Sequence, residues 1–359
     1  MNKNVKLILN ILLAIALIII SNFTPEFLPS YVVRLISLSL IYAIAAMSLN
    51  LINGFTGLFS LGHAGFMAIG AYTTALLTLS AQQKEAIWTI VPIVAPLKNI
   101  SIPYPIALLI GGLVGAIAGF LIGLPVLRLK GDYLAVASLG FGEIISIVFF
   151  NLKSLTNGAL GISGIKPLRG FSASPRPNNF WPMIFCILTF VLLAKFLNSS
   201  YGRAVKAIRE DEIAAESMGI GLGRHKTMSF TIGAFFAAIA GGLLAAVIGS
   251  ITPAQFTFVF TYTILLIVVI GGMGSLTGSI LASFIVTFGM EQLRFMDRLA
   301  INIGPLHIPA REGMRMVVFS ILLILMVLFF RKGIMGTNEI TWDNIVAVFT
   351  KKKKNPEEA

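Results

Sequence analysis

The sequence predicts an all-α membrane protein that crosses the bilayer many times. Of its 359 residues, 57% are hydrophobic and only 12% are charged, whereas about 25% of residues are charged in a typical soluble domain. The apolar residues also come in runs of about 20, the length at which a helix crosses the hydrocarbon core. These runs lack the alternation of β-barrel strands, and a helix satisfies its own backbone in lipid. An ordinary soluble enzyme, a disordered protein and a nucleic-acid-binding protein are excluded.

Ten runs are long and apolar enough to cross the membrane, so we expect about ten transmembrane helices. The runs are 5–21, 31–52, 58–80, 104–127, 133–150, 180–198, 228–250, 257–273, 276–293 and 313–330. The first run follows Lys3 and Lys6, as in a signal peptide, but residues 21–25 make a poor cleavage site. We therefore interpret it as a retained first span.

The distribution of basic residues sets the expected orientation. The formal net charge is +12, which we attribute to topology and to contact with anionic membrane lipids rather than to nucleic acid. With the N-terminus in the cytoplasm, most basic residues fall inside, as the positive-inside rule requires, although loop 151–179 carries four outside. Both termini are then cytoplasmic. We expect a transmembrane domain over 1–335, with a long inside loop at about 199–227, and a cytoplasmic tail over 336–359.

Ten spans divide into two sets of five. Because five is odd, the second set would enter the membrane from the opposite side, which would make the two halves inverted repeats around a pathway. The sequence shows no obvious internal identity between the halves. Two glycine-rich stretches, 53–65 and 271–279, interrupt neighbouring runs. Each is either a broken helix near a pathway, where irregular backbone is tolerated, or a tight turn with close helix packing.

Polar residues inside the apolar runs are candidates for lining a pathway. Glu143 lies in the middle of a run, and a carboxylate facing lipid would cost at least about 2.5 kcal/mol. It either lines or gates a pathway or makes a structural hydrogen bond to a neighbouring helix. His63 either lies beside the pathway or caps a broken helix. The candidate pathway residues are Ser60, Gly62, His63, Glu143, Gly271, Gly272 and Gly274.

The sequence offers no catalytic or metal-binding constellation. The three histidines, His63, His225 and His307, lie far apart, and the single Cys186 lies inside an apolar run. No P-loop pattern for ATP is present. We expect no catalytic residue, no metal site and no cofactor on this chain, and we do not expect an enzyme.

The loop that follows the sixth run is rich in helix formers between Tyr201 and Ile220. In one helix, Ile213, Ala214 and Met218 would share a face, and Gly219 is placed to end it as the C′ residue. Such a compact amphipathic helix could enter a groove on a cytoplasmic partner. The alternative is an ordinary solvated loop helix.

Within this loop, the segment from Glu212 to Glu216, with Gly219 three residues later, resembles the "EAA…G" coupling loop of bacterial ABC importer permeases. The surrounding run from Arg203 to Met218 resembles the branched-chain amino-acid permease family, in particular its LivM-type subunits. Further matches extend from about residue 45 to 335, and they include 57–64, 70–72, 128–133, 138–145, 157–162 and 271–276.

The resemblance implies a permease subunit in the bacterial inner membrane that translocates leucine, isoleucine or valine. It implies a fold like that of the vitamin B12 importer permeases and a heterodimer with a LivH-like permease. Two ATPase subunits, LivG- and LivF-like, would hold ATP and Mg, and an extracytoplasmic binding protein would deliver substrate. The implied ATPase-coupling residues are Arg203, Ile208, Glu212, Ile213, Ala214, Ala215, Glu216, Met218 and Gly219.

Two other functions remain open at this point. A related branch of the family carries urea, so another small polar solute is an alternative substrate. An ATP-independent secondary transporter would need ion-coupling sites, and hence more buried carboxylates than Glu143 alone.

The loop at 81–103 and the stretch after Gly336 are longer than the family pattern requires.

Overall fold

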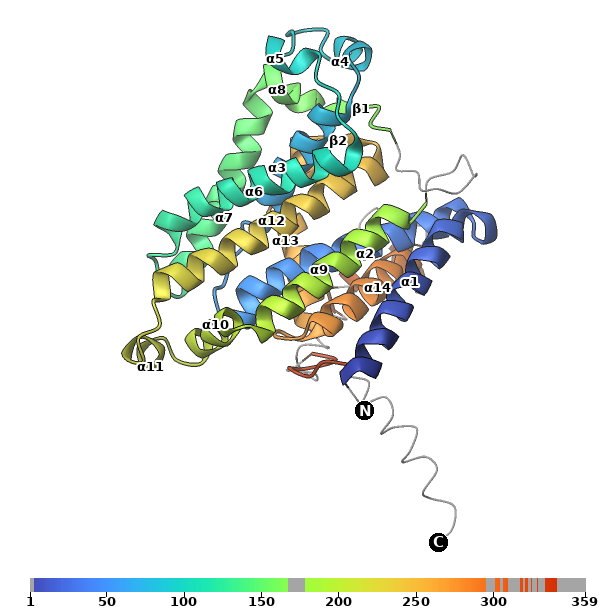
Figure 1. Ribbon diagram of the computed structural model, residues 1–359. Coiled ribbons are helices and arrows are strands. Elements are labelled where there is room, and N and C mark those ends of the chain that lie inside the picture. The colour runs from blue at the N-terminus through green and yellow to red at the C-terminus, as the bar shows by residue number, and fades with distance from the viewer. Residues whose placement is uncertain are drawn as a thin grey trace, which may run out of the picture.

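The computed structural model shows a bundle of long helices with a small cap at one end (Figure 1). It describes residues 3–166, 178–294 and 333–340, together with short pieces between 301 and 328. The end of the bundle opposite the cap carries the two short helices α10 and α11 (Ser200–Glu210 and Glu212–Ser217). We refer to these two ends as the cap end and the loop end.

Each of the first nine predicted runs forms a helix. These helices are α1 Lys3–Phe27, α2 Ser30–Asn50, α3 His63–Thr78, α6 Tyr104–Val126, α7 Asp132–Asn151, α9 Phe180–Asn198, α12 Leu222–Ile248, α13 Phe258–Gly271 and α14 Leu276–Gln292. In the part of the chain that the structure describes, seven helical segments are long and apolar enough to span a membrane. Helices α3 and α14, with 16 and 17 residues, are shorter than this length, whereas α13, with 14 residues, reaches 19 together with the preceding 3₁₀ turn. The tenth run, 313–330, lies largely outside the described residues.

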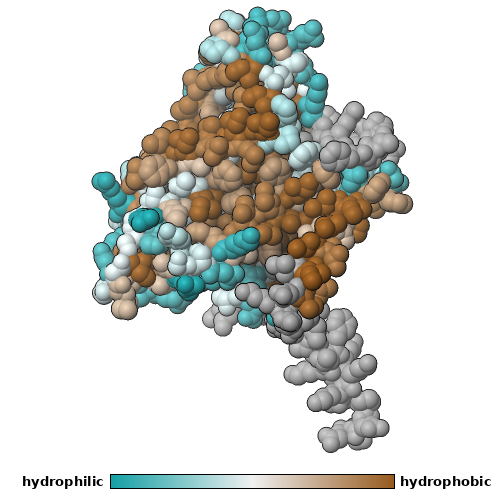
Figure 2. Space-filling model, in the orientation of Figure 1, coloured by the Kyte–Doolittle hydropathy of each residue, from teal (hydrophilic) through white to brown (hydrophobic). Residues whose placement is uncertain are grey.

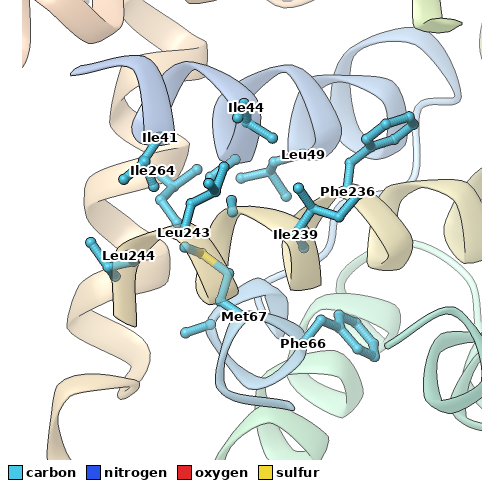
Figure 3. Close-up of a cluster of buried hydrophobic side chains, with 14 of the residues drawn as sticks. Ile41, Ile44, Leu49, Phe66, Met67, Phe236, Ile239, Leu243, Leu244 and Ile264 are labelled. Carbon is cyan, nitrogen blue, oxygen red and sulfur yellow. The ribbon is translucent and has the colours of Figure 1, made fainter. Parts of the chain in front are cut away.

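Helix α12 lies at the centre of the packing, against α2, α3 and α6. Figure 3 shows side chains of α2, α3, α12 and α13 meeting in one apolar cluster. Lipid is as apolar as leucine, so close van der Waals contact through small residues must hold such helices together. A Cβ on Gly70 would lie 1.9 Å from the Ala238 carbonyl oxygen, and one on Gly241 would lie 1.9 Å from that of Met67. The α3–α12 contact therefore depends on glycine from both helices.

The outer helices present apolar side chains outward, as a protein in lipid requires. Figure 2 shows these side chains covering the middle of the molecule, with polar residues at the cap and around α10 and α11. Helix α1 is the most exposed, because only 11% of its most apolar window is buried. This distribution agrees with a multi-pass membrane protein.

The long segment between α3 and α6 folds into the cap instead of forming a loose loop. It contains α4 Ala81–Ile87 and α5 Ala95–Lys98, and it packs on α8 Lys153–Thr156. The Trp88 indole donates to the Lys153 carbonyl at 3.2 Å, and the Val94 amide donates to that of Ser154 at 3.3 Å.

The remaining short elements are two antiparallel strand pairs, a π turn and two 3₁₀ turns. In the cap, β1 Ile162–Ser163 pairs with β2 Ser250–Ile251, and the turns η2 Gly158–Leu160 and η3 Pro253–Gln255 lie beside them in sequence. The second pair is β3 Ile301–Ile303 with β4 Leu306–Ile308. The π turn η1, Leu51–Phe55, extends α2.

Lys84 holds the cap together from inside. Its side chain is completely buried, and its Nζ donates to the carbonyls of Leu97 and Ile100 at 2.7 and 2.6 Å. Burial lowers the pKa of the Lys84 ammonium, because the charged form loses its hydration. The two carbonyls offset this cost and fix the turn after α5.

We expect Lys84→Met to destabilise the cap by about 2 kcal/mol or more, because both carbonyls lose a charge-assisted bond. Thermal unfolding and limited proteolysis of residues 81–103 in detergent would measure the loss. The matched control is Lys98→Met, since Lys98 forms an exposed ion pair with Glu85 at 2.8 Å, worth at most about 1 kcal/mol. Equal effects of the two changes would contradict this role for Lys84.

Candidate functional site

The connection between α2 and α3 is a π turn followed by a non-helical segment. Helix α2 continues through η1, the chain then runs without helix over 56–62, and α3 begins at His63. The Asn53 side chain holds this segment, because its Oδ1 accepts from the Ser60 amide at 3.1 Å and its Nδ2 donates to the Ser60 carbonyl at 3.3 Å. Gly57 has a φ of +74°, which favours glycine. We call residues 51–62 the first break.

The first break leaves the N-terminal amides of α3 inside the bundle, where neighbouring helices satisfy them. The Leu61 amide donates to Ser138 Oγ of α7, and the Ala64 amide donates to Thr261 Oγ1 of α13, both at 2.9 Å. Irregular backbone inside a membrane protein requires such partners, because lipid provides none. Three helices therefore meet where α3 begins.

A second break separates α13 from α14 over residues 271–275. Asn50, at the end of α2 and fully buried, donates through Nδ2 to Gly272 O, Ser275 O and Ser279 Oγ, and accepts through Oδ1 from Gly274 N. These four hydrogen bonds are 2.8 to 3.3 Å long. Gly272 and Gly274 have φ angles of +109° and +104°, which side chains rarely adopt.

The two breaks meet at the loop end. A Cβ on Gly54 would lie 2.7 Å from the Gly274 amide nitrogen. An inverted repeat would place equivalent breaks at opposite ends of the bundle. This pair of breaks is therefore not related by such a repeat.

Residues 333–340, which we call the strap, complete the second break. The amides of Ile334 and Met335 donate to the carbonyls of Ile270 and Gly271 at the end of α13. The Glu339 carboxylate accepts from the amides of Leu276 and Thr277 at 2.6 and 3.0 Å, at the start of α14. The strap thus pairs polar groups that both helix ends leave free. The sequence assigns residues 336–359 to a tail, but 338–340 bond to residues 275–277 and belong to the packed strap.

The expected single helix of the long loop is two helices. Asp211 separates α10 from α11, since its backbone is extended and its Oδ1 accepts from the amides of Ile213 and Ala214 at 2.8 and 3.0 Å. Aspartate favours such N-caps, which ends the first helix despite good helix formers on both sides. Gly219 has a φ of +80° just after α11, so its predicted place as the C′ residue is confirmed.

The proposed coupling residues divide into anchors and exposed residues. Ile208 and Ala215 are buried at 1% and 3% exposure, so they hold the loop against the bundle. Ile213 and Met218 are 78% and 83% exposed, and Ala214 is exposed as well. Glu212 Oε1 pairs with Lys226 Nζ of α12 at 2.5 Å. Arg203, Glu216 and Gly219 are exposed.

The proposed pathway residues form two groups. The first is Ser60, Gly62, His63 and Glu143, and the second is Gly271, Gly272 and Gly274. Glu143, beside the start of α13, lies about 20 Å by helix rise from Gly271 at the end of that helix. Ser60 and His63 lie nearer the second group, because they bond to Asn53 and Ser48, which are close in sequence to the two residues, Gly54 and Asn50, that contact Gly274.

Hydrogen bonds and close contacts fix the first group. Glu143 Oε1 accepts from the Phe258 amide at 2.9 Å, at the start of α13. His63 is completely buried with Nε2 2.8 Å from Ser48 Oγ. A Cβ on Gly62 would lie 2.3 Å from the Ser138 carbonyl oxygen. The small pocket between Glu143 and the neighbouring residues of α3 and α13 is too narrow for a water molecule.

Sequence reasoning missed four residues that contact the breaks, namely Asn50, Asn53, Glu339 and Arg209. The contacts of Arg209 with the glycines are described below. The two asparagines did carry a signal, because an amide at the end of an apolar run must find a hydrogen-bond partner. Glu339 and Arg209 carried none, since their partners lie far away in sequence.

We expect Asn50→Leu to destabilise the protein by about 2 to 4 kcal/mol, because the Gly274 amide would be left unpaired inside the bundle. Thermal unfolding of the purified protein in detergent would measure this loss. Asn151→Leu is the control, since Asn151 is exposed and bonds only to Ile147 O of its own helix, at 2.8 Å. A loss no larger than the control's would contradict the role given to Asn50.

Comparison with known proteins identifies the family. Residues 31–327 match a family model described as a branched-chain amino acid transport system permease component. The chain is 38% identical to LivM of Escherichia coli K12, over 79% of this chain and 68% of LivM. It is 28% identical to a probable LivM of Methanocaldococcus jannaschii (66% and 74% covered) and 27% identical to Escherichia coli LivH (85% and 94%).

No solved structure is significantly similar to this chain. The family assignment therefore rests on sequence, with the family model covering most of the chain and the LivM relatives covering about two thirds or more of it. The chain belongs to the family of branched-chain amino acid transport permeases.

Proposed function

We propose that this chain is the membrane-spanning permease subunit of an ABC importer that carries leucine, isoleucine or valine across the bacterial inner membrane. The observation that carries the proposal is the α10–α11 loop of a chain that belongs to this family. The loop presents an apolar patch at one end of a membrane-spanning bundle. Relatives named LivM and LivH are described as high-affinity branched-chain amino acid transport permeases.

The loop has the properties of a docking knob. Val205, Ile208 and Ala215 are buried against the bundle, while the Asp211 cap and the Glu212–Lys226 pair fix the turn between the helices. A preorganised apolar patch binds a partner groove without a large ordering cost. We infer that Ile213 and Met218 enter a groove on an ATPase subunit, and that the loop end is cytoplasmic.

A second permease would cover the side of the bundle where the first break is open. Phe59 is 45% exposed on a non-helical segment, and Glu143 is only partly buried in the middle of α7. Neither irregular backbone nor a carboxylate is tolerated against lipid. We infer that this side faces a LivH-like permease, which would resemble this chain, with the translocation pathway between the two.

The remaining parts of the importer would lie on other chains. Among the described residues, no cluster of acidic, histidine or cysteine side chains could hold a metal ion. ATP and Mg would be held by LivG- and LivF-like ATPases, whose closure would move α10 and α11 and drive alternating access. An extracytoplasmic binding protein would dock at the cap end and set most of the selectivity. We further propose ten spans and a fold like that of the vitamin B12 importer permeases.

We expect Ile213→Asp to weaken ATPase binding at least about tenfold, because a carboxylate would be buried in an apolar groove. The test is co-purification of the ATPases with the tagged chain and its permease partner, quantified by mass spectrometry. Leu129→Asp is the control, since Leu129 is exposed at the same end but outside the loop. If Ile213→Asp retains stoichiometric ATPases, or if the wild-type chain purifies without them, the docking assignment is wrong.

Glu143 distinguishes the importer from an ion-coupled secondary transporter. We expect Glu143→Gln to keep leucine uptake within about twofold, because the amide oxygen still accepts from the Phe258 amide. Glu143→Leu should instead lower stability by about 1 to 2 kcal/mol. Uptake in proteoliposomes with and without a proton gradient is the measurement. Loss of gradient-driven uptake in Glu143→Gln would favour ion coupling.

A further inference from the structure

We propose that Arg209 is a positioning residue that joins the α10–α11 loop to both helix breaks, so that a displacement of the loop displaces both breaks together. The proposal rests on the function proposed above, in which an ATPase moves this loop. Arg209 is the last basic residue of α10, two positions before the Asp211 cap. It is not among the residues assigned to coupling from the sequence.

The Arg209 side chain spans the two breaks. A Cβ on Gly57 of the first break would lie 3.1 Å from Arg209 Cγ and 3.4 Å from its Cα and Cβ. A Cβ on Gly274 of the second break would lie 2.9 Å from Arg209 Nη1. The aliphatic stem therefore passes over Gly57, and the guanidinium reaches Gly274. Both glycines have positive φ, which glycine adopts readily, and both lack the Cβ that would otherwise crowd the arginine side chain.

The surroundings suit a cation with a planar, forked end. Helix α2 with its π turn ends at Phe55, and α13 ends at Gly271, so two helix C-termini lie next to this side chain. Each C-terminus carries a partial negative charge that favours a nearby cation. The fork of arginine also reaches farther across a surface than the point charge of lysine.

A second contact fixes α10 on the first break. The Lys206 ammonium, one helical turn before Arg209, lies 5.7 Å from the centre of the Phe55 ring, a cation–π distance. Val205 and Ile208 on the same helix are buried. Helix α10 is therefore seated on the π turn along its last turn, and Arg209 extends that contact to the second break.

The second break is supported on its other side as well. Thr337 Cγ2 of the strap lies 3.7 Å from the position of a Cβ on Gly274. Gly274 is thus enclosed between Arg209 and Thr337, with its amide held by Asn50. Because Gly274 is enclosed in this way, a displacement of Arg209 would also displace the adjoining ends of α13 and α14.

The test uses the whole importer, with its ATPases and binding protein, in proteoliposomes that take up radiolabelled leucine. We expect Arg209→Ala to retain the ATPases and ATP hydrolysis, while leucine transported per ATP falls at least about fivefold, in the usual range of coupling energies. Arg209→Lys should restore part of this ratio, since it keeps the stem over Gly57. Arg224→Ala is the control, because Arg224 is exposed at the same end beside α6 and not beside the breaks.

A distance measurement separates coupling from a merely structural role. Spin labels at Glu210, the last residue of α10, and at Met273 of the second break, both exposed, should keep a constant separation with and without trapped nucleotide in the wild type. In Arg209→Ala that separation should change with nucleotide. A nucleotide-dependent separation in the wild type would overturn the proposal, as would an unchanged transport ratio in Arg209→Ala. If the wild-type complex shows no ATP-driven uptake, the proposed function itself fails.

Discussion

Backbone hydrogen bonding inside an apolar bundle is the constraint on which the rest of this structure depends. Two of the connections between its helices, α2 to α3 and α13 to α14, lie against the bundle, and the backbone polar groups that they leave free must find partners in protein because lipid offers none. Asn50 supplies four hydrogen bonds to the second break, and Asn53 supplies two to the first. Glu339 pairs the amides at the start of α14. The backbone groups of the breaks therefore determine the hydrogen bonds of these three side chains.

The same constraint places the functional regions. Both breaks meet at the loop end, so the segment that would receive the movement of a partner lies beside the irregular backbone that would transmit it. The starts of α3 and α13 lie deeper, where Ser138, Thr261 and Glu143 accept from their amides. These polar groups already make defined hydrogen bonds within the chain.

The loop between α9 and α12 shows how local and tertiary effects combine. The exposed patch of Ile213, Ala214 and Met218 follows from helical periodicity, and Gly219 follows from the need for a left-handed residue after the helix. The break at Asp211 was not predicted, since helix propensity favoured continuation and a capping carboxylate outcompeted it. The anchoring of Ile208 and Ala215 depends on neighbouring helices, which a single segment cannot reveal.

The sequence by itself determined the class of protein, the positions of nine helices, the place of the glycine breaks and the family. These depend on composition, on the length of apolar runs and on short motifs, which act locally. Only the tertiary structure decided that the two breaks touch, that Asn50 bonds to residues more than 200 positions away, and that 333–340 form a strap. Hydrogen-bond partners of this kind are set by which helices become neighbours, and the pattern along one helix carries no record of its neighbours.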